Sequence, residues 1–459
     1  MSRWLIIILL INWRLGLAIG QTVTNLYVFT GVDGNSPVGV IQGTDGSFYG
    51  TTYYGGASTN CSQGCGTIFK VSASGSFTNL YFFSSGDGAV PNSSLVQGSD
   101  GSFYGTTAFG GTNLCNCGTV FRITPGGSLT MLYTFGGSPN DGAQPYAGLV
   151  QGSDGNFYGT TRIGGPDNVG TVFRISPSGI KTNLYFFGGL PDGRQPHAAL
   201  VQASDGNFYG TTSQGGPLNR GTVFRISPGG SYTNLYSFGI ESGQDPVFAL
   251  TQGTDGNLYG TAQQGGTNNA GSVFRISPSG SFTNLYTFTD PWRPNSVLVQ
   301  GSDGNFYGTT TYGGNGCASG ALFWISPSGS NFNSYCAGLG PVPDGVVQGI
   351  DGNLYGTTYE GGGGPCNSGC GTIFEISLFL NPPANQISAA QITDSDVVLS
   401  IPSVAGETYQ LQFRTDLTAG MWSNVDGAVV TNSIGALLTL TNFGGALSPQ
   451  GFYRFSITP

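Results

Sequence analysis

The chain has 459 residues, of which 80 are glycine, 12% are aromatic and only 8% are charged. Hydrophobic residues make up 38%, which is enough to bury large cores and excludes global disorder, and the absence of a Gly-x-y period excludes collagen. The formal net charge is −9 and no cluster of Lys and Arg occurs, so we expect no nucleic-acid partner. The single histidine, His197, rules out a zinc site built from several histidines.

The first 20 residues have the form of a secretory signal peptide. Arg3 supplies the positive charge, residues 4–11 are apolar, and Ala-Ile-Gly at 18–20 is a small-residue cleavage site. The alternative is an uncleaved anchor, but the apolar stretch has eight residues where a membrane span needs about 20. We therefore expect a secreted or cell-surface protein without a membrane span after cleavage. Loss of Arg3 and Arg14 leaves 12 basic against 23 acidic residues.

Eight cysteines occur as near neighbours along the rest of the chain. In an exported protein they predict disulfides, and none has the C-x-x-C spacing typical of structural zinc. The sequence leaves the connectivity open. The near pairs are Cys61 and Cys65, Cys115 and Cys117, Cys317 and Cys336, and Cys366 and Cys370.

Internal repetition is the strongest pattern in the sequence. A string of the type Asp-Gly-Asn-Phe-Tyr-Gly-Thr-Thr begins seven times, and each copy is followed by a Gly-Thr-Val-Phe-Arg-Ile-Ser type of string. In the third repeat this pattern predicts four short strands near 149–151, 156–161, 171–176 and 182–187. Four-stranded units of this length, repeated radially, indicate a seven-bladed β-propeller over residues 21–380. The seven strings start at Asp45, Asp100, Asp154, Asp205, Asp255, Asp303 and Asp351.

The order of the strings predicts how the ring closes. The seventh repeat has no Thr-Asn-Leu-Tyr string after its third strand, yet such a string stands before the first repeat, at residues 24–27. We therefore expect the amino-terminal strand to complete blade seven and to pair the two free edges. An open solenoid would not need this permutation.

The repeats closely resemble the Gloeobacter/Verrucomicrobia ("GloVer") tandem-repeat family of exported bacterial proteins. The resemblance rests on the three strings above and covers residues 22–377. It implies export and an extracellular or cell-surface setting. It supplies no catalytic residues, because the family is defined by its repeats.

The composition changes at residue 381, where Asn-Pro-Pro marks a linker. Alternating apolar stretches at 397–401, 409–413, 437–440 and 452–457 predict strands, with Trp422 as a core residue. Residues 381–459 are therefore expected to form a small β-sandwich. They resemble the fibronectin-type-III-like modules of exported bacterial proteins, and the role this implies is that of a spacer or attachment module.

Two faces of the propeller are expected to differ. Turns between first and second and between third and fourth strands barely vary, and we call their side the constant face. Loops between second and third strands and between blades vary in length and chemistry, so this variable face is the expected binding surface. Its candidate ligand-binding residues are Tyr54, Phe109, Tyr146, Arg162, His197, Trp292, Arg293, Tyr312 and Glu360.

Aromatic side chains interleaved with Gln, Arg and Glu suit sugar rings, so an extracellular glycan is the first expected ligand and a protein partner the second. The alternatives are that these aromatics fill the top of the ring or pack between blades, and that His197 is simply solvated. No cofactor or metal is expected. The repeated aspartates form part of a calcium pattern but lack its glutamate, and hairpin turns explain them better.

An enzyme remains the competing hypothesis. A secreted glycan hydrolase or lyase would need two carboxylates, or an acid and a base, at one cleft. The carboxylates of the variable face lie in different repeats without a motif: Asp167, Glu241, Asp245, Asp290 and Glu360. The repeated arginines of the third strands are instead expected to form ion pairs with a neighbouring blade, for example with a turn aspartate.

Overall fold

The computed structural model describes two compact units, one of which consists of Val23–Val347 and Leu354–Ile376. All regular structure in the described part of the chain is strand, without helices. The predicted signal peptide, Cys317, Asp290, the linker at 381 and Trp422 lie outside the described residues. Described are residues 22–458, except 114, 267, 289–291, 314–318, 337–338, 364, 378–388, 394–395, 403–407, 415–422, 432–436 and 443–451.

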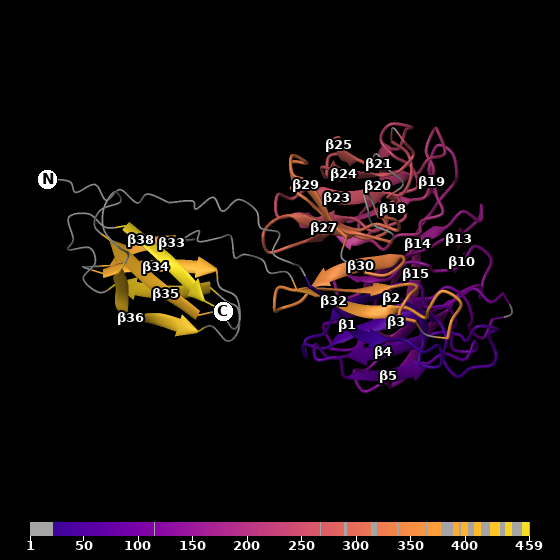
Figure 1. The fold of residues 1–459 in the computed structure, drawn as a ribbon. Helices are drawn as coiled ribbons and strands as arrows, with labels where there is room; N and C mark the ends of the chain where they lie inside the picture. Colours follow the sequence, from indigo (N-terminus) through magenta and orange to yellow (C-terminus); the bar gives the residue numbers. More distant parts are fainter. Residues whose placement is uncertain are drawn as a thin grey trace. The chain divides into compact units, whose positions relative to one another are not determined.

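The larger unit is a seven-bladed β-propeller, as predicted (Figure 1). Each blade is a four-stranded antiparallel sheet, and in blades 1 to 6 the four strands follow one another in sequence. Blade 1 contains β2 (Asn35–Gln42), β3 (Phe48–Tyr54), β4 (Thr67–Val71) and β5 (Phe77–Phe82). Blade 2 contains β6 (Val96–Gln97), β7 (Phe103–Thr107), β8 (Thr119–Ile123) and β9 (Leu129–Thr134). Blade 3 contains β11 (Val150–Gln151), β12 (Phe157–Thr161), β14 (Thr171–Ile175) and β15 (Lys181–Phe186).

The next three blades repeat this order. Blade 4 contains β17 (Val201–Gln202), β18 (Phe208–Thr212), β20 (Thr222–Ile226) and β21 (Tyr232–Ser237). Blade 5 contains β22 (Thr251–Gln252), β23 (Leu258–Ala262), β24 (Ser272–Ile276) and β25 (Phe282–Thr287). Blade 6 contains β26 (Val299–Gln300), β27 (Phe306–Thr309), β28 (Leu322–Ile325) and β29 (Phe332–Tyr335).

Blade 7 joins the two ends of the propeller. Its sheet has the order β1-β32-β31-β30, with β30 (Pro343–Gln348), β31 (Leu354–Thr358), β32 (Thr372–Ser377) and the amino-terminal β1 (Thr22–Val28). Figure 1 shows the indigo β1 in the same sheet as the orange β32. The predicted closure by the first strand is therefore confirmed, and it pairs two edges that would otherwise be open to association.

The cores of the propeller lie between neighbouring blades. At most interfaces the second-strand tyrosine of one blade packs on the second-strand phenylalanine of the next, as Tyr49 does on Phe103 with ring centres 4.0 Å apart, and in blades 5 and 7 Leu258 and Leu354 take the place of the phenylalanine. Tyr355 and Phe48 make the same contact across the closure, also at 4.0 Å. These rings are almost fully buried, and each contributes about 1.5–3 kcal/mol by removal from water. Repetition of Phe and Tyr in the second strand thus encodes blade-to-blade packing.

The constant face carries a repeated polar cluster at each Asp-Gly turn. In blade 2, Asp100 accepts hydrogen bonds from Tyr104 Oη at 3.0 Å and from the Ser102 N–H at 3.0 Å, and it forms an ion pair with Arg122 at 3.1 Å. Lys70 pairs with Asp45 in the same way in blade 1. The predicted aspartate partner is correct, but the pair lies within one blade because the first-second turn and the third strand share a sheet.

The glutamine that ends each first strand links neighbouring blades. Gln97 Nε2 donates to the Gly101 carbonyl of its own turn at 3.2 Å, while its Oε1 accepts from the Thr44 N–H of the preceding blade at 2.9 Å. Gln151 repeats this bridge to Ser99 at 2.9 Å. Hydrogen bonds of this kind contribute about 1 kcal/mol each and fix the relative height of adjacent blades.

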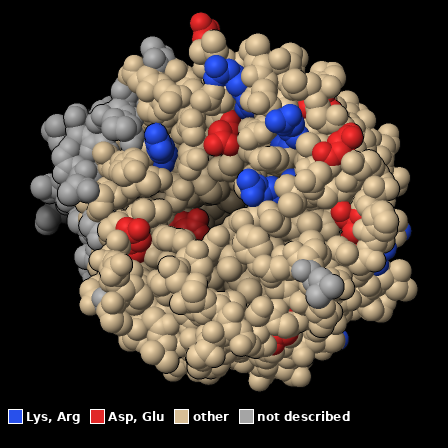
Figure 2. Space-filling model, turned by 90° about the vertical axis from the view of Figure 1, so that its right-hand side faces the viewer, with Lys and Arg blue, Asp and Glu red and all other residues tan. Residues whose placement is uncertain are grey.

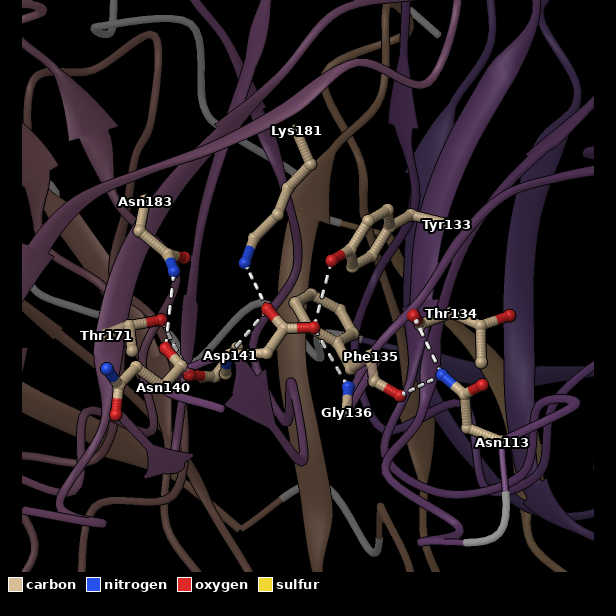
Figure 3. A network of polar contacts seen from close by, with 12 residues as sticks. Asn113, Tyr133, Thr134, Phe135, Gly136, Asn140, Asp141, Thr171, Lys181 and Asn183 are labelled. Carbon is tan, nitrogen blue, oxygen red and sulfur yellow. Dashed lines mark hydrogen bonds and ion pairs between the residues drawn. The ribbon is translucent and has the colours of Figure 1, made fainter. Parts of the chain in front are cut away.

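One blade interface departs from the repeat. Lys181 forms an ion pair with Asp141 that is almost completely buried, with side chains 4% and 2% exposed. Asp141 also accepts from Tyr133 Oη and the Gly136 N–H, both at 2.9 Å (Figure 3). The Lys181 ammonium lies 5.3 Å from the centre of the Tyr133 ring. At the next interface the residue that corresponds to Lys181 is Tyr232, which stacks on Tyr185 with ring centres 4.1 Å apart. Burial lowers the pKa of Lys181, although Asp141 opposes this shift.

The second unit, at the carboxyl end, contains two three-stranded antiparallel sheets. One has the order β33-β34-β37 and the other β36-β35-β38. Four of these strands cover the predicted apolar stretches, whereas β33 and β36 were not predicted. The strands are β33 (Ala389–Thr393), β34 (Asp396–Pro402), β35 (Thr408–Arg414), β36 (Ser423–Thr431), β37 (Leu437–Asn442) and β38 (Phe452–Thr458).

Candidate functional site at the mouth of the propeller

The variable face is built on a repeated joint that the sequence analysis missed. In every blade, the residue before the proline that leads into the first strand has a positive φ between 45° and 59°. This conformation is disfavoured for a side-chain-bearing residue, and more so before proline, so the surroundings must hold it in place. The seven residues are Ser36, Val90, Gln144, Gln195, Asp245, Arg293 and Val342.

Backbone hydrogen bonds hold these residues between two blades. The Gln195 N–H donates to the Val169 carbonyl of the preceding blade at 2.7 Å, and the Gln195 carbonyl accepts from the Ser213 N–H of its own blade at 3.2 Å. The proline that follows packs against a glycine of the preceding blade. A Cβ on Gly170 would lie 2.6 Å from Pro196 Cδ, so only glycine fits there. The joint fixes the residues on either side of each proline relative to two blades.

Short strand pairs continue from these joints toward the rim. β16 (Gly193–Arg194) pairs with β19 (Gln214–Gly215), and β10 (Gly142–Ala143) pairs with β13 (Ile163–Gly164). Each pair joins the loop that enters a blade to the loop between its second and third strands. The candidate residues before the Gly-Gly pairs therefore project from a hydrogen-bonded frame.

The centre of the face opens into a cavity of about 420 Å³. The segments that follow the repeated prolines line it, mostly through small residues such as Ala147, Gly148 and Ala198, and Figure 2 shows the hollow at the centre of this face. In four blades the residue after the repeated proline brings a larger polar group to the cavity. These residues are Asn92, Tyr146, His197 and Asp344.

Three predicted residues form one cluster at this mouth. The ring centres of Tyr146 and His197 lie 5.6 Å apart, and the Arg162 guanidinium lies 5.5 Å from the Tyr146 ring centre. Burial lowers the pKa of His197 to about 4, and the charge of Arg162 adds to this effect. His197 is therefore neutral at pH 7, and its side chain is half-buried where a fully solvated histidine was the expected alternative.

A second cluster of aromatic rings comes from blades 1 and 7. Tyr53 contacts Tyr54 with ring centres 4.5 Å apart and Tyr359 at 6.1 Å. Burial raises the pKa of Tyr53, and the nearby Tyr146, Tyr54 and Tyr359 reinforce the shift. The structure thus brings Tyr54 toward the Tyr146 cluster, together with Tyr53 and Tyr359, which were not among the predicted site residues.

The other candidates lie apart from the centre or have structural contacts. Phe109 makes an edge contact with Tyr146 at 6.0 Å. Trp292 packs on Phe288 at 5.7 Å, as in the expected alternative of packing aromatics. Arg293 is exposed, and Tyr312 is 52% exposed with its N–H donating to the Trp292 carbonyl at 3.1 Å. These last two form a separate group on blade 6.

One carboxylate of the mouth was missed. Asp344 lines the cavity, and burial raises its pKa to about 6 against the opposing hydrogen bond from the Gly39 N–H. Alignment of the residues after the repeated prolines would have found it, because Tyr146 and His197 hold the same place. Glu360 is half-buried near Tyr359, whereas Asp167 and Glu241 are exposed in other loops. Asp245 is partly enclosed, and burial raises its pKa.

Two devices stabilise the loops between second and third strands. Disulfides Cys61–Cys65, Cys115–Cys117 and Cys366–Cys370 close the loops of blades 1, 2 and 7. Cys336 is also disulfide-bonded. In blades 3 to 5 an asparagine at positive φ closes the loop instead of a disulfide. In blade 4, for example, Asn219 Oδ1 accepts a hydrogen bond from the Gly215 N–H at 3.0 Å.

Among the described residues, no group of three or more His, Cys, Asp or Glu side chains is arranged to hold a metal ion. Nor does this part of the chain include a helix of the length and apolarity needed to cross a membrane.

Comparisons with known proteins agree with the fold. A family model, the Gloeobacter/Verrucomicrobia repeat, matches residues 16–142, 114–292 and 221–410. No curated protein matches the chain. A solved streptogramin B lyase has a TM-score of 0.54 at 16% identity, covering 77% of this chain and 96% of its own.

Two further structures are similar. Virginiamycin B lyase from Staphylococcus aureus, solved with selenomethionine, has a TM-score of 0.54 at 18% identity, covering 78% of this chain and 100% of its own. The PQQ-bound aldose sugar dehydrogenase from Streptomyces coelicolor has a TM-score of 0.41 at 17% identity, covering 78% and 98%. The two lyase structures, each with a TM-score of 0.54, share the propeller fold with this chain, and identities this low leave the chemistry open.

Proposed function

The chain belongs to the Gloeobacter/Verrucomicrobia repeat family, and we propose that it is an exported, non-catalytic propeller that binds a glycan at the mouth of its central cavity. One observation carries the proposal. Tyr146, His197 and Arg162 form a contacting cluster beside a cavity of about 420 Å³, with the aromatic rings of Tyr53 and Tyr359 at the same mouth.

The chemistry of this mouth suits a sugar. Aromatic faces stack on the CH-rich faces of sugar rings, while hydroxyl groups need donors and acceptors at the edge. Neutral His197 can donate from one ring nitrogen and accept at the other. The backbone frame and the disulfide loops hold these groups in place before binding, which reduces the entropy lost on association.

The disulfides also support the proposed location. Three described pairs are oxidised, and stable disulfides are typical of exported proteins. Export of this chain remains part of the proposal, together with removal of residues 1–20.

The test is size-exclusion chromatography of residues 21–459 with a panel of soluble polysaccharides. Co-elution without shortening of the polysaccharide is expected. Tyr146→Ala should weaken binding about tenfold, because one stacking contact is lost. Ile180→Ala is the matched control, since Ile180 is 73% exposed in a turn of the constant face. Equal losses for both variants would contradict the proposed site.

A catalytic role is the second candidate, and Asp344 is the observation that favours it. Its carboxyl group lines the cavity, and a carboxyl whose pKa is raised to about 6 suits proton transfer near neutral pH. If the protein shortens a polysaccharide and Asp344→Asn abolishes this activity, the protein is an enzyme and the proposal of a non-catalytic binder is overturned. Co-elution with unchanged polysaccharide size would instead support the binder. Binding of no polysaccharide would favour a protein partner.

A further inference from the structure

The propeller distributes its basic side chains unevenly between its faces. Lys70 and the third-strand arginines lie beside the turn aspartates of the constant face, and Lys181 is buried against Asp141. All the others in residues 22–377 lie in loops of the variable face, in blades 3 to 6. They are Arg162, Arg194, Arg220 and Arg293.

None of these four arginines forms an ion pair with a described carboxylate. Arg194 Nη2 contacts the neutral Gln214 Oε1 at 3.3 Å, and Arg162 Nη1 contacts Gln144 Oε1 at 3.4 Å. Their positive charge therefore has no compensating partner among the described side chains. Figure 2 shows basic side chains gathered around one side of the central hollow, with acidic ones among them.

Arg162 has an additional unsatisfied group. Its Nε is buried and has no hydrogen-bond partner, which is costly for a charged donor. The guanidinium also lies 5.5 Å from the centre of the Tyr146 ring, which lines the cavity. An anionic acceptor that reaches this mouth would compensate the charge of the guanidinium. A planar carboxylate matches the guanidinium fork better than a single hydroxyl does.

We propose, on the basis of the glycan-binding function above, that the ligand is an acidic polysaccharide whose uronate carboxylates bind Arg162. The adjacent Tyr146 and neutral His197 would contact the sugar ring that carries the carboxylate. The two acidic groups of the mouth, Asp344 and Glu360, belong to blade 7, as does Tyr359. This places the carboxylate edge of the ligand toward blades 3 and 4 and an uncharged edge toward blade 7.

Polygalacturonate and its methyl ester provide the test, because they share a sugar backbone and differ in charge. Isothermal titration of residues 21–459 should give at least tenfold weaker binding to the ester. Arg162→Gln should weaken binding to the acid by about tenfold and leave binding to the ester unchanged. Arg174→Gln removes the same charge from the constant face and should change neither. Circular dichroism confirms that each variant is folded.

The outcomes separate the two proposals. Equal affinity for acid and ester would overturn the acidic ligand while supporting glycan binding. Unchanged affinity of Arg162→Gln for the acid would overturn the role of Arg162. Binding of the ester and neutral polysaccharides, but not of the acid, would also contradict the acidic ligand. If no polysaccharide binds, the glycan-binding function itself fails.

Discussion

Pro37 packs directly against Gly371, so that the first strand of blade 1 touches blade 7. A Cβ on Gly371 would lie 2.4 Å from Pro37 Cδ, and Gly371 has a φ of +92°. The same joint carries hydrogen bonds from the Phe29 N–H to the Gly371 carbonyl at 3.1 Å and from the Ser36 N–H to the Cys370 carbonyl at 2.9 Å. The closure therefore uses the same proline–glycine contact as the blade joints within the ring.

Gly371→Ala should destabilise the propeller by roughly 2–4 kcal/mol. The alanine would be held at a positive φ, and its methyl group would overlap the Pro37 ring. Urea unfolding followed by tryptophan fluorescence measures the change in the free energy of unfolding.

Gly86→Ala is the matched control for this substitution. Gly86 has no heavy atom within 4 Å of a Cβ position and is not among the glycines with positive φ. We expect its free energy of unfolding to change by less than about 0.5 kcal/mol. A similar loss for both variants would mean that the Pro37 contact does not limit stability.

Much of the propeller was predictable because the strand-forming strings occur in the same order in each repeat. Residues 24–27 before the first repeat also identified β1 as the missing strand of blade 7. The blade joint was missed because it depends on a positive φ at residues as different as Val90, Gln195 and Arg293. No residue type marks that conformation in the sequence, although the proline after each one was a usable signal.

The candidate site was predicted less completely. Tyr146, Arg162 and His197 were identified one by one from variable loops, but their mutual contact depends on how three blades meet around the cavity. Tyr54 was predicted as a site residue and its neighbour Tyr53 was not. Side chains alternate between the two sides of a strand, and the sequence does not show which side faces the centre of the propeller. Asp344 was missed because it resembles the Asp-Gly turn residues of the constant face.

The ion pair between Lys181 and Asp141 should be replaceable by an aromatic contact. At the next interface Asp192 accepts from Tyr185 Oη at 2.9 Å and the Gly193 N–H at 2.7 Å, while Tyr232 occupies the place of Lys181. Lys181→Phe recreates this arrangement. We expect its free energy of unfolding to remain within about 1 kcal/mol of the wild type, because the Asp141 carboxylate keeps hydrogen bonds from Tyr133 Oη and two backbone N–H groups, like those of Asp192 at the next interface.

Asp141→Ala is the contrasting variant at the same interface. It leaves the Lys181 ammonium buried without its carboxylate and Tyr133 Oη without an acceptor. We expect a loss of roughly 3–5 kcal/mol, measured by urea unfolding at pH 7. The double variant with Lys181→Phe should recover part of this loss. An equal loss of stability in Lys181→Phe and Asp141→Ala would show that the positive charge of Lys181 is required at this interface.

The described disulfides predict the state of the thiols in exported protein. Denaturation without reductant should expose no thiol that reacts with a thiol reagent, because each described pair is closed. Peptide mapping should then recover Cys61 with Cys65 and Cys366 with Cys370. Reduced protein, carried through the same steps, is the control that reports the full number of cysteines. Reactive thiols in the unreduced sample would contradict the oxidised loops.

His197 should titrate far below the usual range for histidine. Its pKa is lowered to about 4 by burial and by Arg162, whereas in the unfolded chain it is about 6.5. It is the only histidine, so a sample labelled at histidine gives one ring signal. We expect that signal to stay constant between pH 8 and 5.5. In Arg162→Gln the pKa should rise, and a titration centred near 6.5 in the wild type would contradict the enclosed site.

Asp344 and His197 should act in opposite directions on stability in acid. The pKa of His197 is about 4 in the folded protein and about 6.5 in the unfolded chain, so between these values only the unfolded chain binds a proton at this residue. The contribution of His197 to stability is therefore lost as pH falls from about 6.5 to 4. The pKa of Asp344 is raised to about 6, so its contribution is lost as pH rises from about 4 to 6. The two effects oppose each other between pH 4.5 and 6, and the wild type should vary little there.

Asp344→Asn should uncover the histidine effect. The variant should be more stable than the wild type at pH 7, because a buried carboxylate is removed. Its free energy of unfolding should then fall by up to about 1.4 kcal/mol per pH unit below pH 6.5. Asp167→Asn is the control, since Asp167 is exposed on the same face and should leave the wild-type profile unchanged. Parallel pH profiles for Asp344→Asn and wild type would contradict the raised pKa and remove the main support for Asp344 as a proton donor.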